Sequence, residues 1–312
     1  MPKQNGARTW PVTAALLSVM TVAGLGLTAC QPGGAAKTPP TTASTPAVPP
    51  RAVTAQELDL LHRAKQLLLR DCMRAHGFVY LPVPREPVPE ARDFPYGIDD
   101  PAWAARHGLG SDIDRQRERI RRQDPNQVYF RALSPERKAV ALRTANGPEL
   151  AGLTARTADG AVLTRSNQGC QAESDRTLYG DLGRWFQAAS TAESLAELRR
   201  QRVLADPAYA EAARAWSACM RKAGHSYADP ARLRAAVGTQ RSLPKAREVA
   251  MALAEARCAR SSGLAATAAE LDREHAARLR QGREAEADAQ RRLQLTALPR
   301  ARSVVDGATA GG

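Results

Sequence analysis

The sequence predicts a mainly α-helical protein with one small β-hairpin and two halves, each closed by a disulfide. Three observations support this fold class. Only 4% of the 312 residues are aromatic, while Ala and Arg are abundant, which favours helices with small interfaces over a sheet-rich core. An Asp159-Gly160 pair between two Thr- and Leu-bearing runs is typical of a hairpin turn. Finally, one cysteine-containing stretch occurs twice.

The duplicated stretch ends a helical pattern in both copies. Cys, Met, Arg, Gly and Tyr recur at identical offsets, as Cys72, Met73, Arg74, Gly77 and Tyr80 and again as Cys219, Met220, Arg221, Gly224 and Tyr227. Each Gly stands where a helix is expected to stop. We expect Met73 in the core, and Arg74 and Arg221 near the exposed carbonyls of the last turn. The alternative to this capping role is that Arg74 and Arg221 bind an anion.

Four cysteines remain once Cys30 is set aside, because Cys30 lies in a separate N-terminal motif. Four cysteines in an oxidising compartment allow three pairings. One further cysteine follows each copy of the repeat, so the repeat favours two disulfides within the halves, Cys72–Cys170 and Cys219–Cys258.

The Cys-Met-Arg-x-x-Gly repeat resembles that of a group of secreted lipoproteins of actinobacteria. The resemblance covers residues 55–298. It also includes Pro95-Tyr96-Gly97 with Asp100-Pro101, Tyr129-Phe130-Arg131-Ala132-Leu133-Ser134-Pro135, Gly169-Cys170 and Leu178-Tyr179-Gly180-Asp181. It implies an architecture and a location outside the cytoplasm, and no chemistry.

The N-terminus predicts a lipoprotein signal peptide over residues 1–29. Lys3 and Arg8 precede an uncharged apolar stretch, which ends in Leu27-Thr28-Ala29 directly before Cys30. A transmembrane helix and an ordinary cleaved signal are the alternatives, but residues 12–28 are short for a span and contain two glycines. By resemblance, Cys30 carries a diacylglycerol, whose two chains anchor the protein stably to the outer face of the cell membrane.

Residues 30–53 are predicted to form a tether, because they are rich in Pro and Thr and lack apolar periodicity. The net charge of the whole chain is +13, and loss of Lys3 and Arg8 with the signal peptide leaves +11. The arginines are spread along the chain, which favours a compositional origin over one binding site. Export argues against a nucleic-acid partner.

The first half is expected over residues 54–182. Thr54-Ala55-Gln56-Glu57 is a capping box that opens the helix leading to Cys72. Five prolines between Pro82 and Pro95 indicate an extended loop. Helix starts follow where a cap residue precedes Pro, at Asp100-Pro101, Asp124-Pro125 and Ser134-Pro135. The hairpin is expected over residues 153–165.

The second half is expected over residues 183–298. Ser190-Thr191-Ala192-Glu193 is read as a capping box, and Asp206-Pro207 opens the helix with the second repeat copy. Residues 264–295 are expected to form one long, partly exposed helix, and residues 299–312 a disordered tail. His62, His107 and His275 have no acid or nucleophile at a telling spacing and are assigned to the surface.

No motif for catalysis or for a cofactor is present. The chain lacks His-Glu-x-x-His, Gly-x-Ser-x-Gly and a phosphate-binding Gly-rich loop. Cys72 and His76 could be half of a metal site, but the spacing is not repeated in the second copy, and disulfides compete for the thiols, so no metal ligand is assigned. A pair of Asp or Glu side chains for glycoside hydrolysis leaves no sequence signature.

The leading interpretation is a non-enzymatic, membrane-anchored binding or accessory protein of the cell envelope. Its partner is expected to be an anionic wall polymer or an envelope protein complex. Arg273, Arg278, Arg280, Arg283, Arg291 and Arg292 make the C-terminal helical region the expected contact, although interleaved acids cancel much of their charge. The alternative is a cell-wall hydrolase, which would need two buried carboxylates converging in a cleft. A third interpretation is a structural surface protein without a ligand.

The lipid anchor is tested by Cys30→Ala, which removes the only sulfur that the motif offers to the lipid. We expect the variant to be released into the medium or to remain unprocessed, as judged by membrane fractionation and electrophoretic mobility. Unchanged membrane retention at unchanged size would refute lipidation.

Overall fold

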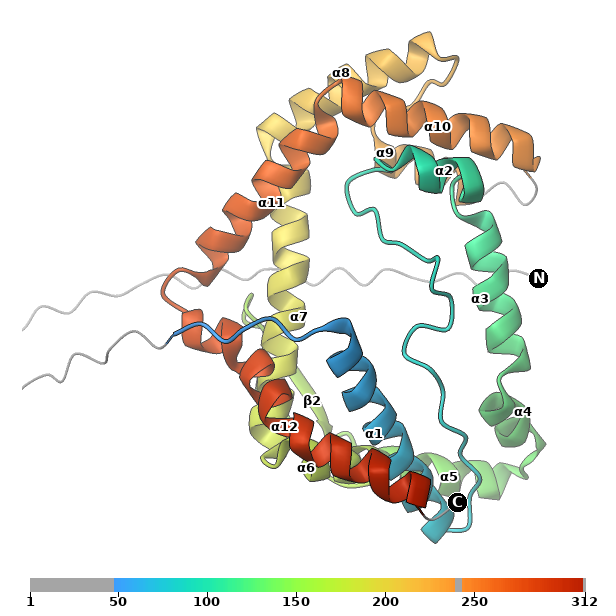
Figure 1. Ribbon diagram of the computed structural model, residues 1–312, viewed down its shortest axis with the longest axis vertical. Helices are drawn as coiled ribbons and strands as arrows, with labels where there is room; N and C mark the ends of the chain where they lie inside the picture. Colours follow the sequence, from blue (N-terminus) through green and yellow to red (C-terminus); the bar gives the residue numbers. More distant parts are fainter. Residues whose placement is uncertain (1–47, 239–242, 311–312) are drawn as a thin grey trace, which may run out of the picture. The chain divides into compact units, whose positions relative to one another are not determined.

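Figure 1 shows a computed structural model of the chain, which describes residues 48–238 and 243–310. The described residues form twelve α-helices and one two-stranded sheet, which confirms the predicted fold class. The predicted signal peptide, Cys30 and most of the tether lie outside these residues. No helix among them combines the length and the apolar character that a membrane span requires.

The helices cover most of the described chain. They are α1 (Ala55–Ala75), α2 (Pro101–His107), α3 (Ser111–Gln123), α4 (Pro125–Ala132), α5 (Pro135–Asn146), α6 (Cys170–Tyr179), α7 (Leu182–Ala205), α8 (Pro207–Lys222), α9 (Pro230–Gly238), α10 (Lys245–Ser261), α11 (Leu264–Arg280) and α12 (Glu284–Ala310).

Helix starts follow the predicted caps closely. The Thr54 hydroxyl accepts a hydrogen bond from the Glu57 backbone N–H at 3.2 Å, while the Glu57 carboxylate accepts from the Thr54 N–H at 2.9 Å. This reciprocal pair is the predicted capping box. Asp100, Asp124 and Asp206 likewise cap α2, α4 and α8, each with Pro at the first helical position.

One predicted helix start is wrong. Ser190 and Thr191 lie inside α7, and Asp181 caps that helix by accepting the Arg184 N–H at 2.9 Å. The Thr191 hydroxyl instead accepts from the Gln187 side chain, and both Ser190 and Thr191 are buried. Their polar groups therefore serve packing within a continuous helix.

The predicted hairpin is present as β1 (Gly152–Arg156) and β2 (Val162–Ser166). The strands are antiparallel with Thr154 opposite Thr164. The Gln187 side chain of α7 accepts the Arg156 N–H at 2.9 Å and donates to the Arg156 carbonyl at 2.8 Å. This double contact satisfies the backbone of β1 at its last residue and fixes the hairpin against α7.

Both predicted disulfides are formed. Cys72 is linked to Cys170 across 98 residues, and Cys219 to Cys258 across 39 residues. Loop-closure entropy alone gives about 4.7 and about 3.9 kcal/mol of stabilisation, respectively. The pairing inferred from the repeat is therefore confirmed, with one disulfide in each half.

The glycine and the methionine of the repeat have structural roles. Both copies end in the same Schellman-type C-cap, in which two backbone N–H groups after the helix return to its last carbonyls. The bonds are Gly77 to Arg74 (2.9 Å) and Phe78 to Met73 (3.0 Å) in the first copy, and Gly224 to Arg221 (3.0 Å) and His225 to Met220 (2.8 Å) in the second. Gly77 and Gly224 have φ of 76° and 84°, which only glycine adopts readily. Met73 and Met220 are buried, as predicted for Met73.

The packing crosses the predicted boundary between the halves. Helix α12 lies along α1 and α6, where Ala297, Leu298 and Ala301 are buried in one cluster with Leu61 and Leu178 (Figure 1). In the opposite sense, side chains from residues 88–113 share a cluster with α10. The two sequence halves therefore do not form two independent cores, and α7 contacts elements of both.

Two expectations about the C-terminal region are wrong. The single helix predicted over residues 264–295 is divided at Gly282, whose φ is 75°, into α11 and α12. The disordered tail predicted over residues 299–312 is helical up to Ala310, with Pro299 inside α12. Buried Ala301 and the Arg300 side chain, which donates to the Leu178 carbonyl at 2.6 Å, offset the hydrogen bond that proline cannot make.

The C-cap account is tested by Gly77→Ala and Gly224→Ala. A Cβ would meet no atom within 4 Å at either position, so only the left-handed backbone opposes the change. We expect each variant to lose about 1 kcal/mol of unfolding free energy. The control is Gly307→Ala inside α12, where a Cβ also meets nothing and which should gain about 0.5 kcal/mol. Urea denaturation measures all three, and equal effects at the three positions would contradict the account.

Candidate functional site

The two arginines of the repeat do not form a common site. Arg74, at the end of α1, is exposed and lies 3.1 Å from the Asp71 carboxylate. Arg221, at the end of α8, is exposed and donates to the Ser217 hydroxyl at 3.1 Å. The two helices pack into different hydrophobic clusters. Each arginine thus has a local partner, and an anion site built on both together is not supported.

The Cys72 and His76 pair lies with Cys170 in a group whose ligand atoms are within 4.8 Å of one another. The two sulfurs are bonded to each other, so neither is a thiolate that could hold a metal ion. In the oxidised protein this group is therefore a disulfide with a neighbouring histidine.

Four carboxylates are almost fully buried among the described residues, namely Asp175, Glu248, Glu255 and Asp288. Asp175 lies 2.6 Å from Lys65 and 2.9 Å from Arg165. Asp288 lies 2.9 Å from Arg280, whose hydrogen bonds lower the Asp288 pKa. These two carboxylates are neutralised by cations and tie neighbouring elements together.

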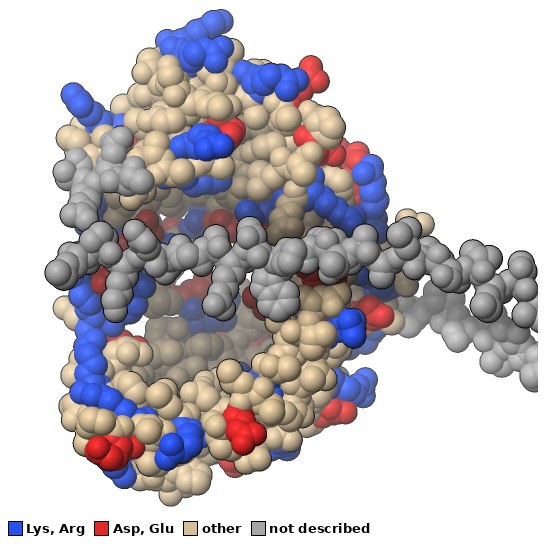
Figure 2. Space-filling view, turned by 180° about the vertical axis from the view of Figure 1, so that it is seen from behind, with Lys and Arg blue, Asp and Glu red and all other residues tan. Residues whose placement is uncertain are grey.

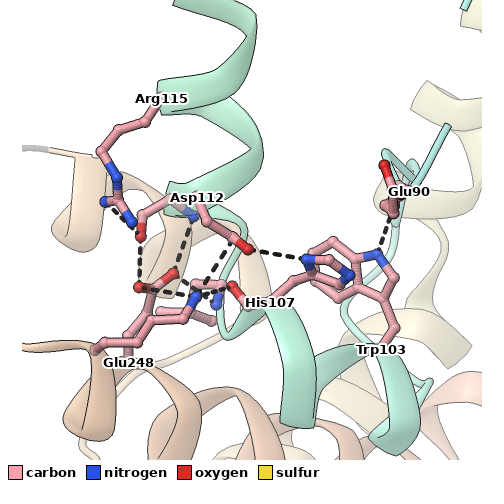
Figure 3. Close-up of polar contacts among 9 residues, drawn as sticks. Glu90, Trp103, His107, Asp112, Arg115 and Glu248 are labelled. Carbon is pink, nitrogen blue, oxygen red and sulfur yellow. Dashed lines mark hydrogen bonds and ion pairs between the residues drawn. The ribbon is translucent and has the colours of Figure 1, made fainter. Parts of the chain in front are cut away.

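Glu248 acts as a cap for the first turn of α3 (Figure 3). It accepts the backbone N–H groups of Leu109 and Ser111 at 3.0 and 2.9 Å, and also the Ser111 hydroxyl at 2.5 Å. Beside it, a nitrogen of His107 lies 2.9 Å from the Asp112 carboxylate. The Ser111 hydroxyl donates to Glu248 while His107 faces Asp112, so serine and histidine do not form a Ser–His pair here.

Glu255 holds the loop that contains Pro95-Tyr96-Gly97. Its carboxylate accepts the Ile98 N–H at 3.0 Å, while Tyr209 donates to the Tyr96 carbonyl at 3.0 Å. Burial raises the pKa of Glu255 to about 7. Gly97 has φ of 128°, which favours glycine, and a Cβ there would lie in tight contact with Pro230, at 3.0 Å. These contacts therefore fix the loop of residues 94–98 against α8 and α10.

His275 is not on the surface as predicted. It is 8% exposed and lies 3.2 Å from Asp206, the residue that caps α8. The sequence separation of 69 residues hid this acid partner. Here histidine joins α11 to the start of α8.

One concave surface rich in arginine lies between the end of β1, the start of α7 and the start of α12. It encloses about 1000 Å³. Four arginines line it, and Glu286 is its single carboxylate. We call this surface the arginine groove; its arginines are Arg156, Arg184, Arg283 and Arg292.

Local structure explains how these arginines come together. The two hydrogen bonds of the Gln187 side chain fix Arg156 beside α7. The Asp181 cap places Arg184 in the first turn of that helix. Gly282 breaks the chain before α12 and leaves Arg283 at its start. The N-terminal turns of α7 and α12 therefore both border the groove, although Asp181 caps the first and Glu284 and Glu286 lie in the second.

Most other arginines of the C-terminal region are paired with acids. Arg273 pairs with Glu270, Arg278 with Glu274 at 2.8 Å, and Arg280 and Arg291 with Asp288. Figure 2 shows basic and acidic side chains interspersed over one face of the molecule. Arg184 and Arg283, by contrast, have no ion pair within the described part of the chain. Arg292 of the groove also lies 3.9 Å from the Asp288 carboxylate. The expected cancellation of charge therefore extends to Arg292 but not to Arg283.

The sequence identified half of the groove. Arg283 and Arg292 belonged to the predicted contact region, whereas Arg156 and Arg184 carried no signal. They are separated from α12 by about a hundred residues, and only the docking of α12 beside α7 brings them to the same surface.

The role of Glu255 predicts a dependence of stability on pH. Its folded pKa of about 7 exceeds the ordinary value of 4.5, so between these values the folded protein retains a proton that the unfolded chain releases. Stability from this group is therefore lost as pH rises through that window. We expect Glu255→Gln, which keeps an acceptor for Ile98, to match the parent near pH 4.5 and to exceed its unfolding free energy by a few kcal/mol at pH 8. An equal difference at both pH values would contradict this assignment.

Comparison of the chain with known proteins found no matching family, no similar curated protein and no similar solved structure. The function must therefore be argued from the chain itself.

Proposed function

We propose that the protein is a lipid-anchored, extracytoplasmic binding protein of the cell envelope, whose ligand is anionic and occupies the arginine groove. The observation that carries this proposal is the groove itself, whose volume of about 1000 Å³ is lined by four arginines and one glutamate. The location rests on the signal peptide and lipid-attachment motif at Cys30.

The residue types of the groove suit an extended anion better than a compact apolar ligand. Guanidinium groups present planar donors that match carboxylate and phosphate oxygens. The four arginines come from three separate elements, so a linear polymer can contact them one after another. An anionic wall polymer, whose repeating charges face an anchored protein at the membrane, has this form. Because the groove is open to solvent, its affinity should depend strongly on salt.

A hydrolase, the alternative from the sequence, needs two carboxylates that converge in a cleft. The four buried carboxylates of the described chain are held by cations or by backbone N–H groups, and Glu286 is the single acid of the groove. The groove chemistry therefore favours binding.

The proposal is tested with the mature, lipidated protein in a nonionic detergent. Binding to purified anionic wall polymer is measured across a salt series for the parent and for Arg184→Gln with Arg283→Gln. We expect the double variant to bind about tenfold more weakly at low salt, since two exposed charge contacts together contribute about 1.4 kcal/mol. Its affinity should also depend less steeply on salt.

The matched control is Arg273→Gln with Arg278→Gln, which removes the same charge from α11, outside the groove. This pair should bind within about twofold of the parent. Equal losses in both double variants would replace the groove by a general charge effect. Absence of binding even at low salt, with anionic vesicles also failing, would overturn an anionic ligand and favour a protein partner.

A further inference from the structure

A second basic surface surrounds one of the two disulfides. Cys219 and Cys258 both line an open concavity of about 810 Å³. The charged residues that line it are Lys222, Arg257 and Arg260, and no acid is among the lining residues. All three cations are exposed and none has an ion pair within the described residues. We call this surface the basic concavity.

The other disulfide has the opposite surroundings. The Cys72 sulfur lies 3.3 Å from a carboxylate oxygen of Glu173. The two bonds are buried to a similar degree. Each joins a half-buried cysteine at the end of a repeat helix to a cysteine that is at most 2% exposed. The chain thus holds two disulfides of similar burial, one beside three cations and one beside the Glu173 carboxylate and the His76 ring.

Thiol–disulfide exchange requires a thiolate to reach a disulfide sulfur, so the charge around the sulfur controls the encounter. We propose that the Cys219–Cys258 disulfide is an exchange site for an anionic thiol, which the basic concavity recognises. This site is separate from the arginine groove and does not depend on its ligand.

The reaction balances as an ordinary exchange. The thiolate attacks the accessible Cys219 sulfur, the Cys219–Cys258 bond breaks, and its electron pair leaves on Cys258 as a thiolate that takes a proton from water. A second thiolate, from a second molecule or from the same dithiol, then attacks the mixed disulfide and releases Cys219. The incoming thiols become a disulfide, and two electrons reduce the protein.

Recognition of the incoming anion must be distinguished from the quality of the leaving group. Cys170 is the first residue of α6, where the helix dipole favours a thiolate. Cys258 is in the last turn of α10, where the dipole opposes one. The preference for Cys219–Cys258 therefore comes from the charge of the incoming thiol, and a neutral thiol does not experience it.

The test reduces the mature protein with three thiols of similar size and different charge. They are 3-mercaptopropionate, 2-mercaptoethanol and cysteamine, used at equal thiolate concentrations, and the rate at each disulfide is followed by alkylation and peptide mapping. The measured quantity is the reduction rate at Cys219–Cys258 divided by the rate at Cys72–Cys170. We expect this ratio to be about fivefold or more higher for 3-mercaptopropionate than for cysteamine. High salt should abolish the trend. Because both rates come from one molecule and one thiol, differences in nucleophilicity cancel in the ratio.

Two variants test the assignment to particular charges. Arg257→Gln with Arg260→Gln should flatten the trend by slowing the anionic thiol at Cys219–Cys258. Glu173→Gln should flatten it by speeding the same thiol at Cys72–Cys170. All three side chains are exposed, so the fold should be kept. A ratio that is the same for the three thiols, or one that these variants leave unchanged, would overturn the proposal.

Discussion

The docking of α12 against α1 and α6 is the contact on which the rest of the arrangement depends. It buries Ala297, Leu298 and Ala301 against Leu61 and Ala64, and small side chains on both helices allow a close approach. The chain has few aromatic residues, so its stability must come from many such small interfaces. This docking also carries Arg283 and Arg292 to the face of α7. Without it, the arginine groove would have only one wall.

The sequence predicted what is decided locally. The Thr54 capping box, the Asp-Pro helix starts and the Asp159-Gly160 hairpin depend on neighbouring residues, and all are present. The disulfide pairing followed from the repeat. The sequence failed where distant contacts outweigh local preference. Pro299 ordinarily ends a helix, yet contacts between α12 and α1 retain helical structure on both sides of it. The groove is equally non-local, since Arg184 lines it together with residues of α12 that follow about a hundred positions later in the chain.

The repeat and the charge therefore have different explanations. In the repeat, glycine permits the left-handed C-cap, methionine fills the core and cysteine closes the disulfide, so the motif specifies architecture. In the arginine groove and the basic concavity, by contrast, function is suggested by arginines that lack acidic partners. Arg184 and Arg283 mark one such place, and Arg257 and Arg260 mark another.

We propose that the protein binds an anion where β1, α7 and α12 meet. Hydrogen-exchange mass spectrometry of the mature protein, with and without anionic wall polymer, tests it most directly because it locates the contact. Exchange is predicted to slow at the hairpin turn around Arg156, at the first turn of α7 and at the first turn of α12. Slowing confined to other elements, such as α3 to α5, would contradict the account, as would a bound polymer that changes exchange at none of the three.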